Sequence, residues 1–222
     1  MKKLTQKILF SLVGKIGIIS LMAICLAMFN SNTKAQTLLV NYDFATAVAG
    51  TPCTATPLTT APGVTSIFTT GGTDGETCTT PLGMSPRLEA FAENQDGSQS
   101  VGLNSSTIGA VNYFQFQLSG LGSYRDYKLY FQAMHGDSID VQYSIDGNNF
   151  MSFTQIPRDL RKWRSPSILI DLSPVTAING QPTVYFRLVG LSSPNGSLYF
   201  VIDNFQVLAT RATKKRNRVR VF

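Results

Sequence analysis

The chain has 222 residues, of which 43% are hydrophobic and 14% are charged, and its formal net charge is +6. That positive charge lies at the two ends, because residues 1–35 hold five lysines and no acid, and residues 211–222 hold six basic residues. The body between them, residues 36–210, has 8 basic and 13 acidic side chains, a net of −5. A nucleic-acid-binding fold needs basic residues clustered on a structured face, so this class of function is excluded.

The first 35 residues have the pattern of an export signal. Three lysines near the start precede an apolar run of 14 residues, Ile16 to Phe29, and a short polar stretch follows. Thr33 and Ala35 are the small residues that signal peptidase requires before its cleavage site. The apolar run is shorter than the roughly 20 residues of a membrane span. We therefore expect cleavage after Ala35, a secreted or cell-surface location and no membrane span in the mature protein, with retention as an anchor as the alternative.

Two cysteines, Cys53 and Cys78, remain after that cleavage, in a segment rich in Thr, Gly and Pro. In an oxidising compartment an even pair of this kind indicates a disulfide. Closing a loop of roughly 25 residues would stabilise the fold by about 3 kcal/mol in the chain-entropy view. The alternative is a metal site that uses both thiolates, but no further Cys or His lies nearby in the sequence.

Strand patterns dominate the body of the chain, where runs rich in aromatic and β-branched residues are separated by Gly, Pro, Asn and Asp. In chain order we expect strands within residues 37–44, 63–70, 86–93, 98–103, 112–118, 127–135, 138–145, 149–155, 163–172, 183–191 and 197–208. The turn Asp146-Gly147-Asn148 is of the kind that closes a hairpin. Residues 45–80 are expected to form long loops held by the disulfide.

Alternation within the strands predicts the layers of the fold. Residues 112–118 place Phe114, Phe116 and Leu118 on one face and polar or tyrosine side chains on the other, so one face is buried. Repeated over the chain, this spacing predicts an all-β fold of two antiparallel sheets packed as a β-sandwich. Pairing of the first and last strands would remove an exposed edge, which favours a jelly roll over an immunoglobulin-like topology.

The predicted organisation is a signal peptide over residues 1–35, a β-sandwich domain over 36–210 and a basic tail over 211–222. The six like charges of the tail repel one another, and we expect it to be disordered. Three interpretations of the tail stay open: a solvated end, a contact with an anionic cell surface, or a linker to a further domain.

Two motifs at the ends of the domain carry a family resemblance. Leu38-Leu-Val-Asn-Tyr-Asp-Phe44 resembles the opening strand, and Leu198-Tyr-Phe-Val-Ile-Asp-Asn-Phe-Gln-Val207 the closing strand, of secreted bacterial jelly-roll modules of the carbohydrate-binding, galactose-binding-like type. The rhythm of Tyr113-Phe-Gln-Phe, Val141-Gln-Tyr-Ser-Ile-Asp-Gly-Asn and Val184-Tyr-Phe-Arg-Leu is similar. The resemblance spans residues 37–208 and implies the fold more than the ligand.

The same resemblance implies a structural calcium ion that bridges the first and last strands in several such families. Carried over, Asp203 would be the ligand, with Asp43 as a further candidate. Asn204 stands where the closing motif often has a second acid. Calcium takes six to eight oxygens, so the alternative is that Asp203 caps or hydrogen-bonds a neighbouring loop.

No catalytic constellation is recognisable in the sequence. The single histidine, His135, lies at a strand end, and no Gly-x-Ser-x-Gly turn surrounds a serine. A glycosidase would need a pair of carboxylates, and spacing selects no pair among the five candidate acids: Glu89, Glu93, Asp137, Asp140 and Asp146. We therefore expect a protein that is not an enzyme.

Aromatic side chains are the remaining candidates for function, because the apolar face of a sugar packs on an exposed ring. The possible platforms are Tyr113, Tyr124, Tyr130, Tyr143, Trp163 and Tyr185, and the predicted ligand-binding set is Trp163, Tyr124 and Arg164. The first hypothesis is a secreted, non-catalytic binding module for a polysaccharide or cell-surface glycan. The alternatives are a structural or adhesive domain or spacer with protein partners and, last, an extracellular hydrolase.

Overall fold

The computed structural model describes residues 35–48, 54–72, 78–79, 101–105, 111–135, 138–157, 168–191 and 198–212. The side chains of residues 78–79, 101–105, 134–135, 191 and 198–199 are not part of the description. The elements are β1 (Gln36–Tyr42), β2 (Thr59–Thr60), β3 (Thr65–Gly72), β4 (Cys78–Thr79), β5 (Val101–Ser105), β6 (Val111–Ser119), β7 (Tyr124–His135), β8 (Ile139–Ser144), β9 (Met151–Ile156), β10 (Ile168–Asp171), the short 3-10 helix η2 (Thr176–Ile178), β11 (Thr183–Leu191) and β12 (Leu198–Arg211).

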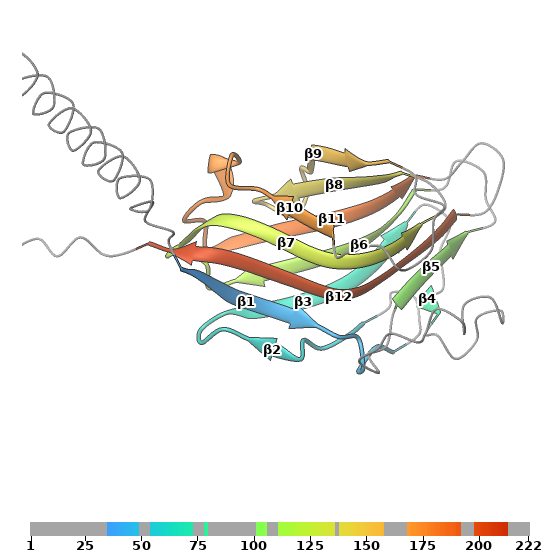
Figure 1. The fold of residues 1–222 in the computed structure, drawn as a ribbon, viewed down its shortest axis with the longest axis horizontal. Helices are drawn as coiled ribbons and strands as arrows, with labels where there is room; N and C mark the ends of the chain where they lie inside the picture. The colour runs from blue at the N-terminus through green and yellow to red at the C-terminus, as the bar shows by residue number, and fades with distance from the viewer. Residues whose placement is uncertain are drawn as a thin grey trace, which may run out of the picture. The chain divides into compact units, whose positions relative to one another are not determined.

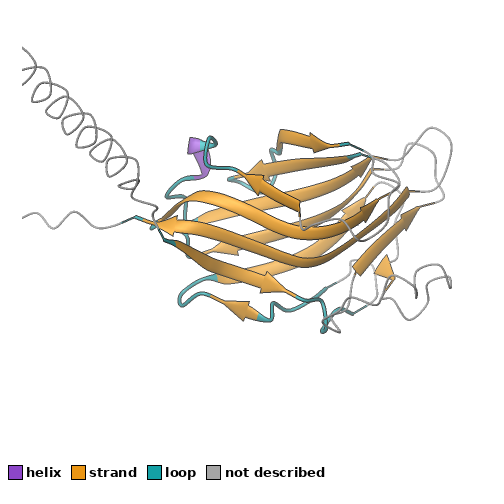
Figure 2. Ribbon diagram, in the orientation of Figure 1, coloured by secondary structure: helices purple, strands orange, loops and turns teal. Residues whose placement is uncertain are grey.

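These strands form two antiparallel sheets packed face to face (Figures 1 and 2). The five-stranded sheet has the order β3-β6-β11-β8-β9. The seven-stranded sheet has the order β10-β7-β12-β1-β2, and β5, which pairs with β12, carries β4 on its other side. The fold is therefore the all-β, antiparallel two-sheet sandwich that the alternation of apolar residues predicts, and its strand order is that of a jelly roll.

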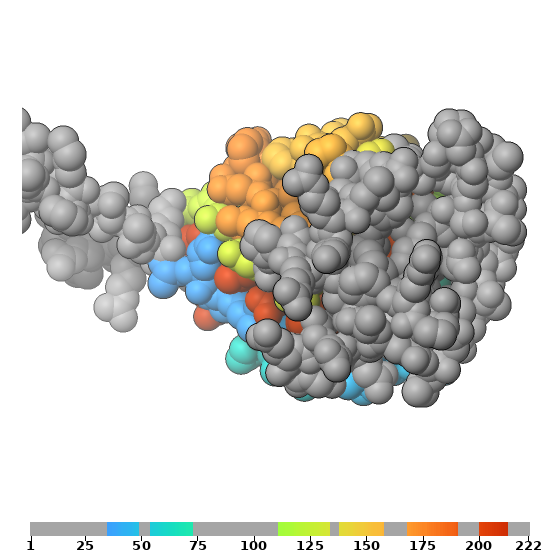
Figure 3. Space-filling view, turned by 45° about the vertical axis from the view of Figure 1, so that its right-hand side comes forward, coloured from blue at the N-terminus to red at the C-terminus, as the bar shows by residue number. Residues whose placement is uncertain are grey.

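The first and last strands of the domain lie side by side, as predicted. β1 pairs antiparallel with β12 from Gln36 opposite Thr210 to Tyr42 opposite Phe205. In Figure 3 the blue atoms of β1 lie against red atoms of β12. This pairing gives each terminal strand a second neighbour, since β1 also binds β2 and β12 also binds β7. Neither end of the domain leaves β1 or β12 as an unpaired sheet edge.

The core between the sheets is rich in aromatic rings contributed by both layers. Phe114 and Phe116 of β6 and Phe186 of β11 point inward from one sheet, and Phe131 of β7 and Phe205 of β12 point inward from the other. The rings of Phe116 and Phe205 stack at 3.5 Å between centroids with 5° between their planes. Face-to-face contact between the two layers therefore runs through this pair.

A bulge in β12 allows both halves of this long strand to face the core. The pairing with β7 shifts between Asp203 and Gln206, where Asn204 has a φ of +50°. Ile202 and Phe205 both belong to the core although they are three positions apart, whereas strict two-residue alternation would place them on opposite faces. Asparagine tolerates this left-handed backbone better than most residues, so the Asp203-Asn204 step of the closing motif serves the geometry of the bulge.

Two short strands were not predicted from the sequence. β2 and β4 lie inside residues 45–80, which were expected to be loops, so that prediction is wrong for these two-residue pairs. Each forms only by pairing with a longer strand, β2 with β1 and β4 with β5, and two residues carry no periodic pattern. The strand predicted over residues 86–93 lies outside the described residues, as do residues 163–167 of another.

The predicted disulfide also falls partly outside the description. Cys78 opens β4, where only its backbone is described, and Cys53 lies outside the described residues. The bridge between them stays a prediction. Within the described ranges, no helix has the length and apolar character needed to cross a membrane.

Candidate functional site

The outer face of the five-stranded sheet carries a group of half-buried aromatic and amide side chains. β6 presents Tyr113, Gln115 and Gln117 between its inward residues, and β11 presents Tyr185 and Arg187. Phe150, just before β9, and Gln142 of β8 complete the group, which we call the aromatic face (Tyr113, Gln115, Gln117, Gln142, Phe150, Tyr185 and Arg187). Each of its members is neither fully buried nor fully exposed, as expected for side chains that lie along the sheet surface.

Arg187 is the centre of the aromatic face. Its guanidinium carbon is 4.0 Å from the centroid of the Tyr113 ring and 3.5 Å from that of Phe150. Its Nε donates a hydrogen bond of 2.7 Å to Oε1 of Gln115, the residue directly opposite on β6. Cation–π contacts of this kind contribute about 0.5–2 kcal/mol. The two rings and the amide fix the plane of the guanidinium, and its partial burial lowers the pKa of Arg187.

Two glycines provide the space in which the tyrosine rings lie. Gly71 is paired with Tyr113 across β3 and β6, and a Cβ at Gly71 would meet Cζ of that ring at 2.6 Å. In the turn after β8, a Cβ at Gly147 would meet Cζ of Tyr185 at 2.9 Å. Both rings therefore rest on backbone that has no side chain, and a Cβ at either position would displace them.

Substitution Gly71→Ala is expected to weaken any ligand binding at the aromatic face while leaving the fold intact. Gly71 does not have a left-handed φ, so alanine fits its backbone, and the clash falls on the end of the Tyr113 ring. The measurements are ligand affinity and thermal denaturation. Gly122→Ala is the matched control, because a Cβ there meets only one backbone oxygen, at 4.0 Å. Equal affinity of the two variants would show that the position of the Tyr113 ring is irrelevant.

The turn between β8 and β9 is held by Asp146, whose carboxylate accepts several hydrogen bonds. Oδ1 accepts the N–H groups of Asn148 and Asn149 at 2.9 and 2.8 Å and the Ser144 hydroxyl at 2.8 Å. Oδ2 accepts the Asn149 side-chain amide at 2.7 Å. The turn closes the predicted hairpin and delivers Phe150, whose ring meets Tyr185 edge-on at 6.5 Å. Asp146 thus helps to position the Phe150 ring that lies against the Arg187 guanidinium.

Removal of this carboxylate is expected to have a pH-dependent effect on stability. The Asn149 N–H and amide, followed by the Asn148 N–H and the Ser144 hydroxyl, hold the pKa of Asp146 well below its ordinary value. A lowered pKa stabilises the fold above the unfolded pKa, near 4, and this contribution is lost as the pH falls below that value. Asp146→Asn should therefore melt below the wild type at pH 7, with a smaller difference at pH 3. A gap of the same size at both pH values would contradict this assignment.

Asp140 is the acid beside the aromatic face, and its carboxylate is already bonded. Oδ2 accepts the Gln142 amide at 2.7 Å, and Oδ1 accepts the Ser152 hydroxyl at 2.5 Å. The residue is 7% exposed. These bonds hold Gln142 in position beside Arg187, its partner across β8 and β11. The arrangement makes Asp140 a support that positions Gln142 on the aromatic face.

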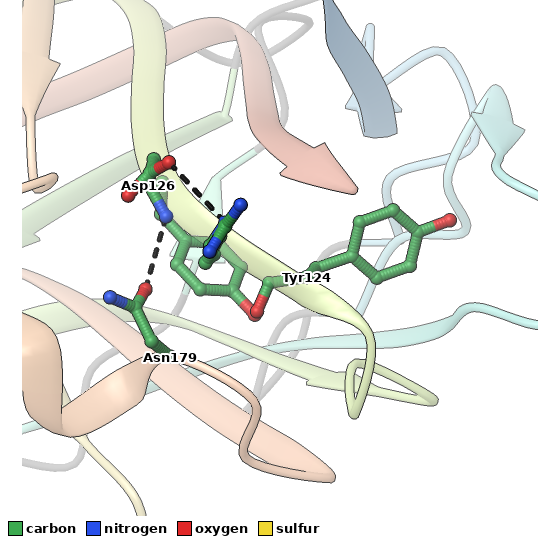
Figure 4. Close-up of polar contacts among 5 residues, drawn as sticks. Tyr124, Asp126 and Asn179 are labelled. Atoms are coloured by element: carbon green, nitrogen blue, oxygen red, sulfur yellow. Dashed lines mark hydrogen bonds and ion pairs between the residues drawn. The ribbon is translucent and has the colours of Figure 1, made fainter. Parts of the chain in front are cut away.

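The predicted ligand-binding set is not brought together on this face. Tyr124 is 5% exposed and belongs to the core, so its ring offers no surface, contrary to expectation. It opens β7, and Figure 4 shows its ring directed away from the contact in which the Asp126 N–H donates to Oδ1 of Asn179 at 3.0 Å. Trp163 and Arg164 lie outside the described residues, so their role stays a prediction.

The other candidate tyrosines lie in different places. Tyr113 and Tyr185 lie on the aromatic face, whereas Tyr130 is exposed on the opposite side of the sandwich, paired with Leu169 of β10. Tyr143 packs against the core. Of the candidate acids, Asp140 and Asp146 are bonded within the sheet and its turn. Glu89, Glu93 and Asp137 lie outside the described residues, as does the side chain of His135.

The residues proposed as calcium ligands, Asp203 and Asp43, offer few side-chain oxygens to a metal ion. Asp203 is fully buried, and its Oδ1 accepts the Asn204 N–H at 2.7 Å. Asp43 caps a turn through the Ala45 N–H at 3.2 Å. Within the described ranges, no group of three or more His, Cys, Asp or Glu side chains could hold a metal ion. These residues do not form the carboxylate-rich set that calcium takes from side chains, and the ion stays a prediction.

Tyr113 and Tyr185 are the only members of the aromatic face among the candidates from the sequence; its three glutamines, Arg187 and Phe150 were missed. Arg187 is the polar residue in the alternating run Val184-Tyr-Phe-Arg-Leu188, and Phe150 follows the turn that closes the hairpin. Strand parity alone places Tyr113, Tyr185 and Arg187 on outward positions. Strand parity does not give the register between β6, β11 and β8, and this register is what brings residues from three strands side by side.

No known protein family matches the chain, and no curated protein sequence matches it. Several solved structures are similar to it. One is TmCBM61 in complex with beta-1,4-galactotriose, at 14% identity, with 63% of this chain and 86% of that chain covered and a TM-score of 0.38. Another is a variant of a carbohydrate-binding module of family 29, at 12% identity, with 80% and 94% covered and a TM-score of 0.42.

A third similar structure is a cleaved adhesin domain of Lys-gingipain from Porphyromonas gingivalis, at 14% identity. The similarity covers 77% of this chain and 99% of that domain, with a TM-score of 0.46. The chain itself is an antiparallel two-sheet β-sandwich.

Proposed function

We propose that the protein is a non-catalytic glycan-binding module whose ligand lies across the aromatic face. The observation that carries this proposal is the row of half-exposed Tyr113 and Tyr185 rings separated by Arg187 and bordered by the amides of Gln115 and Gln142. A sugar presents an apolar face to an aromatic ring and hydroxyl groups to amides. The aromatic face offers both kinds of partner on one side of one sheet.

The position of the rings favours binding without large rearrangement. They are carried by strands, and each is held by backbone or side-chain contacts: Tyr113 over Gly71 and against Arg187, and Tyr185 over Gly147 and against Phe150. Sites on such elements lose less conformational entropy on binding than sites on loops. This supports a preformed surface for an extended chain of sugars.

The chemistry of the face supports binding rather than hydrolysis. Glycosidases need two carboxyl groups facing one glycosidic bond. Among the described residues at this face, Asp140 is tied to Gln142 and Ser152, and Asp146 is tied to its own turn. Together with the N-terminal export pattern, this is the basis for proposing a secreted or surface-exposed, non-catalytic module.

The test is binding of the purified protein to a panel of neutral and acidic polysaccharides, measured by affinity electrophoresis and by isothermal titration calorimetry. We expect binding to at least one polymer and no release of reducing ends from it. Absence of binding across the panel would contradict the glycan proposal. Release of reducing ends would instead support a hydrolase.

A second candidate, an adhesive domain with a protein partner, is favoured by one observation on the other sheet. Leu38, Tyr130 and Leu169 are 40%, 37% and 47% exposed, and they lie on the outer side of β1, β7 and β10. A contiguous exposed apolar patch on a sheet face is typical of a protein contact. Substitution Leu169→Asp together with Tyr130→Ala should abolish such a contact without affecting a glycan on the aromatic face.

A further inference from the structure

Arg187 carries a positive charge that no acid of the described chain compensates. Its one hydrogen bond there is the bond from Nε to Gln115, and the described ion pairs involve other cations, Arg125 and Lys128. Asp140 lies two residues along β8 from Gln142, the residue opposite Arg187, and its carboxylate is occupied by Gln142 and Ser152. A half-buried guanidinium without a counter-ion is expensive unless a ligand or solvent completes its coordination.

The free donors of Arg187 are its terminal nitrogens. The faces of the guanidinium are covered by Tyr113 and Phe150, and Nε is used by Gln115. The two Nη atoms are not among the buried atoms without a hydrogen-bond partner, so solvent reaches them. Together they form a planar pair of donors, the arrangement that binds two oxygens of one carboxylate or sulfate.

The orientation of these donors is fixed before any ligand arrives. Stacking between two rings sets the plane of the group, and the bond to Gln115 sets its rotation within that plane. An arginine held in this way loses little side-chain entropy when it binds an anion. A guanidinium that served only to separate the two rings would not need a specific rotation.

We propose that the preferred ligands of the aromatic face are acidic glycans, whose carboxylate or sulfate group binds the Nη donors of Arg187 while neighbouring sugar rings lie on Tyr113 and Tyr185. This inference rests on the proposed glycan-binding function and specifies the ligand class. Charge-assisted hydrogen bonds are stronger than neutral ones. An acidic polymer should therefore bind more tightly than its uncharged counterpart.

The test compares polymers that differ only in charge. Polygalacturonate is compared with its fully methyl-esterified form, and dextran sulfate with dextran, in titrations of the wild-type protein, Arg187→Gln and Arg187→Lys. We expect the acidic member of one pair to bind more tightly, Arg187→Gln to lose about 10- to 100-fold in affinity for it, and Arg187→Lys to fall between. The carboxylate and sulfate arms distinguish the two sources of the anion.

A matched control is Arg211→Gln, because Arg211 is an exposed arginine at the end of β12 in the other sheet. It should leave both affinities unchanged, whereas a general effect of net charge would lower them as Arg187→Gln does. Equal binding of the charged and neutral members, with binding still dependent on Tyr113, would overturn the inference and leave the glycan proposal standing. Undiminished binding of acidic polymers by Arg187→Gln would overturn it as well.

Discussion

The double substitution Tyr113→Ala and Tyr185→Ala is expected to reduce glycan affinity below detection while the protein stays folded. Both rings lie on the outer side of the five-stranded sheet, outside the core. Aromatic side chains at the centre of a binding surface commonly contribute about 2 kcal/mol each, which corresponds to roughly 30-fold in affinity per ring. Calorimetric titration of the double variant and of each single variant measures this loss.

The matched control for these variants is Tyr130→Ala. Tyr130 is also a tyrosine on a central strand and is 37% exposed, but it lies on the outer side of the seven-stranded sheet. Its removal should leave glycan affinity unchanged. If Tyr130→Ala weakened binding as much as Tyr113→Ala, the ligand would lie on the wrong sheet for our account. Circular dichroism of all variants separates loss of binding from loss of fold.

Substitution Phe205→Ala is expected to have the largest effect on stability. Phe205 is fully buried, stacks on Phe116 from the opposite sheet and lies 6.2 Å from the ring of Phe131. Truncating a buried phenylalanine costs about 3–5 kcal/mol, through lost transfer energy and the cavity left behind. Since a domain is stable by only about 5–15 kcal/mol in total, urea denaturation should show a large fall in midpoint or no folded baseline.

Two further variants make this prediction specific. Phe205→Leu refills part of the cavity and should lose less than half as much stability as Phe205→Ala. Tyr130→Ala, which removes an exposed ring, should change the free energy of unfolding by about 0.5 kcal/mol or less. A small loss for Phe205→Ala, comparable to that of Tyr130→Ala, would mean that the two sheets do not pack through the Phe116–Phe205 pair.

Much of the fold could be predicted from the sequence because burial on one side of a sheet imposes a period of two. The alternation of Phe114, Phe116 and Leu118 with polar neighbours is found in β6, where the inward residues are fully buried. The same reasoning identified the hairpin around Gly147, whose φ of +77° suits glycine. Each of these signals lies within about ten residues of chain.

What could not be predicted depends on contacts between distant segments. β2 and β4 exist only through pairing with β1 and β5. The bulge at Asn204 is invisible as a pattern, because the same Asp-Asn step is equally compatible with a turn, and only pairing with β7 shows that the strand continues. The burial of Tyr124 is a further case, since its loop-like neighbours Gly122 and Ser123 suggested exposure.

The candidate site follows the same division. Outward parity placed Tyr113 and Tyr185 among the possible platforms, yet the sequence favoured aromatic and basic residues in Arg-rich or loop segments. The contacts of Arg187 join β6, β11 and the β8–β9 turn. Gln115 and Arg187 alone are 72 positions apart in the chain. The register across three strands depends on tertiary contacts, so it cannot be predicted from the periodicity of any single strand.

The most direct test of the account is to locate a bound acidic oligosaccharide on the protein by nuclear magnetic resonance shift mapping of backbone amides and of the Arg187 side chain. We expect the shifts to concentrate at residues 113–117, 140–150 and 185–187, with the largest change at the Arg187 guanidinium. Residues 128–132 and 206–208, on the outer side of the other sheet, should not move. Shifts confined to that second group, with Arg187 unaffected, would contradict the claim that the aromatic face is the binding surface.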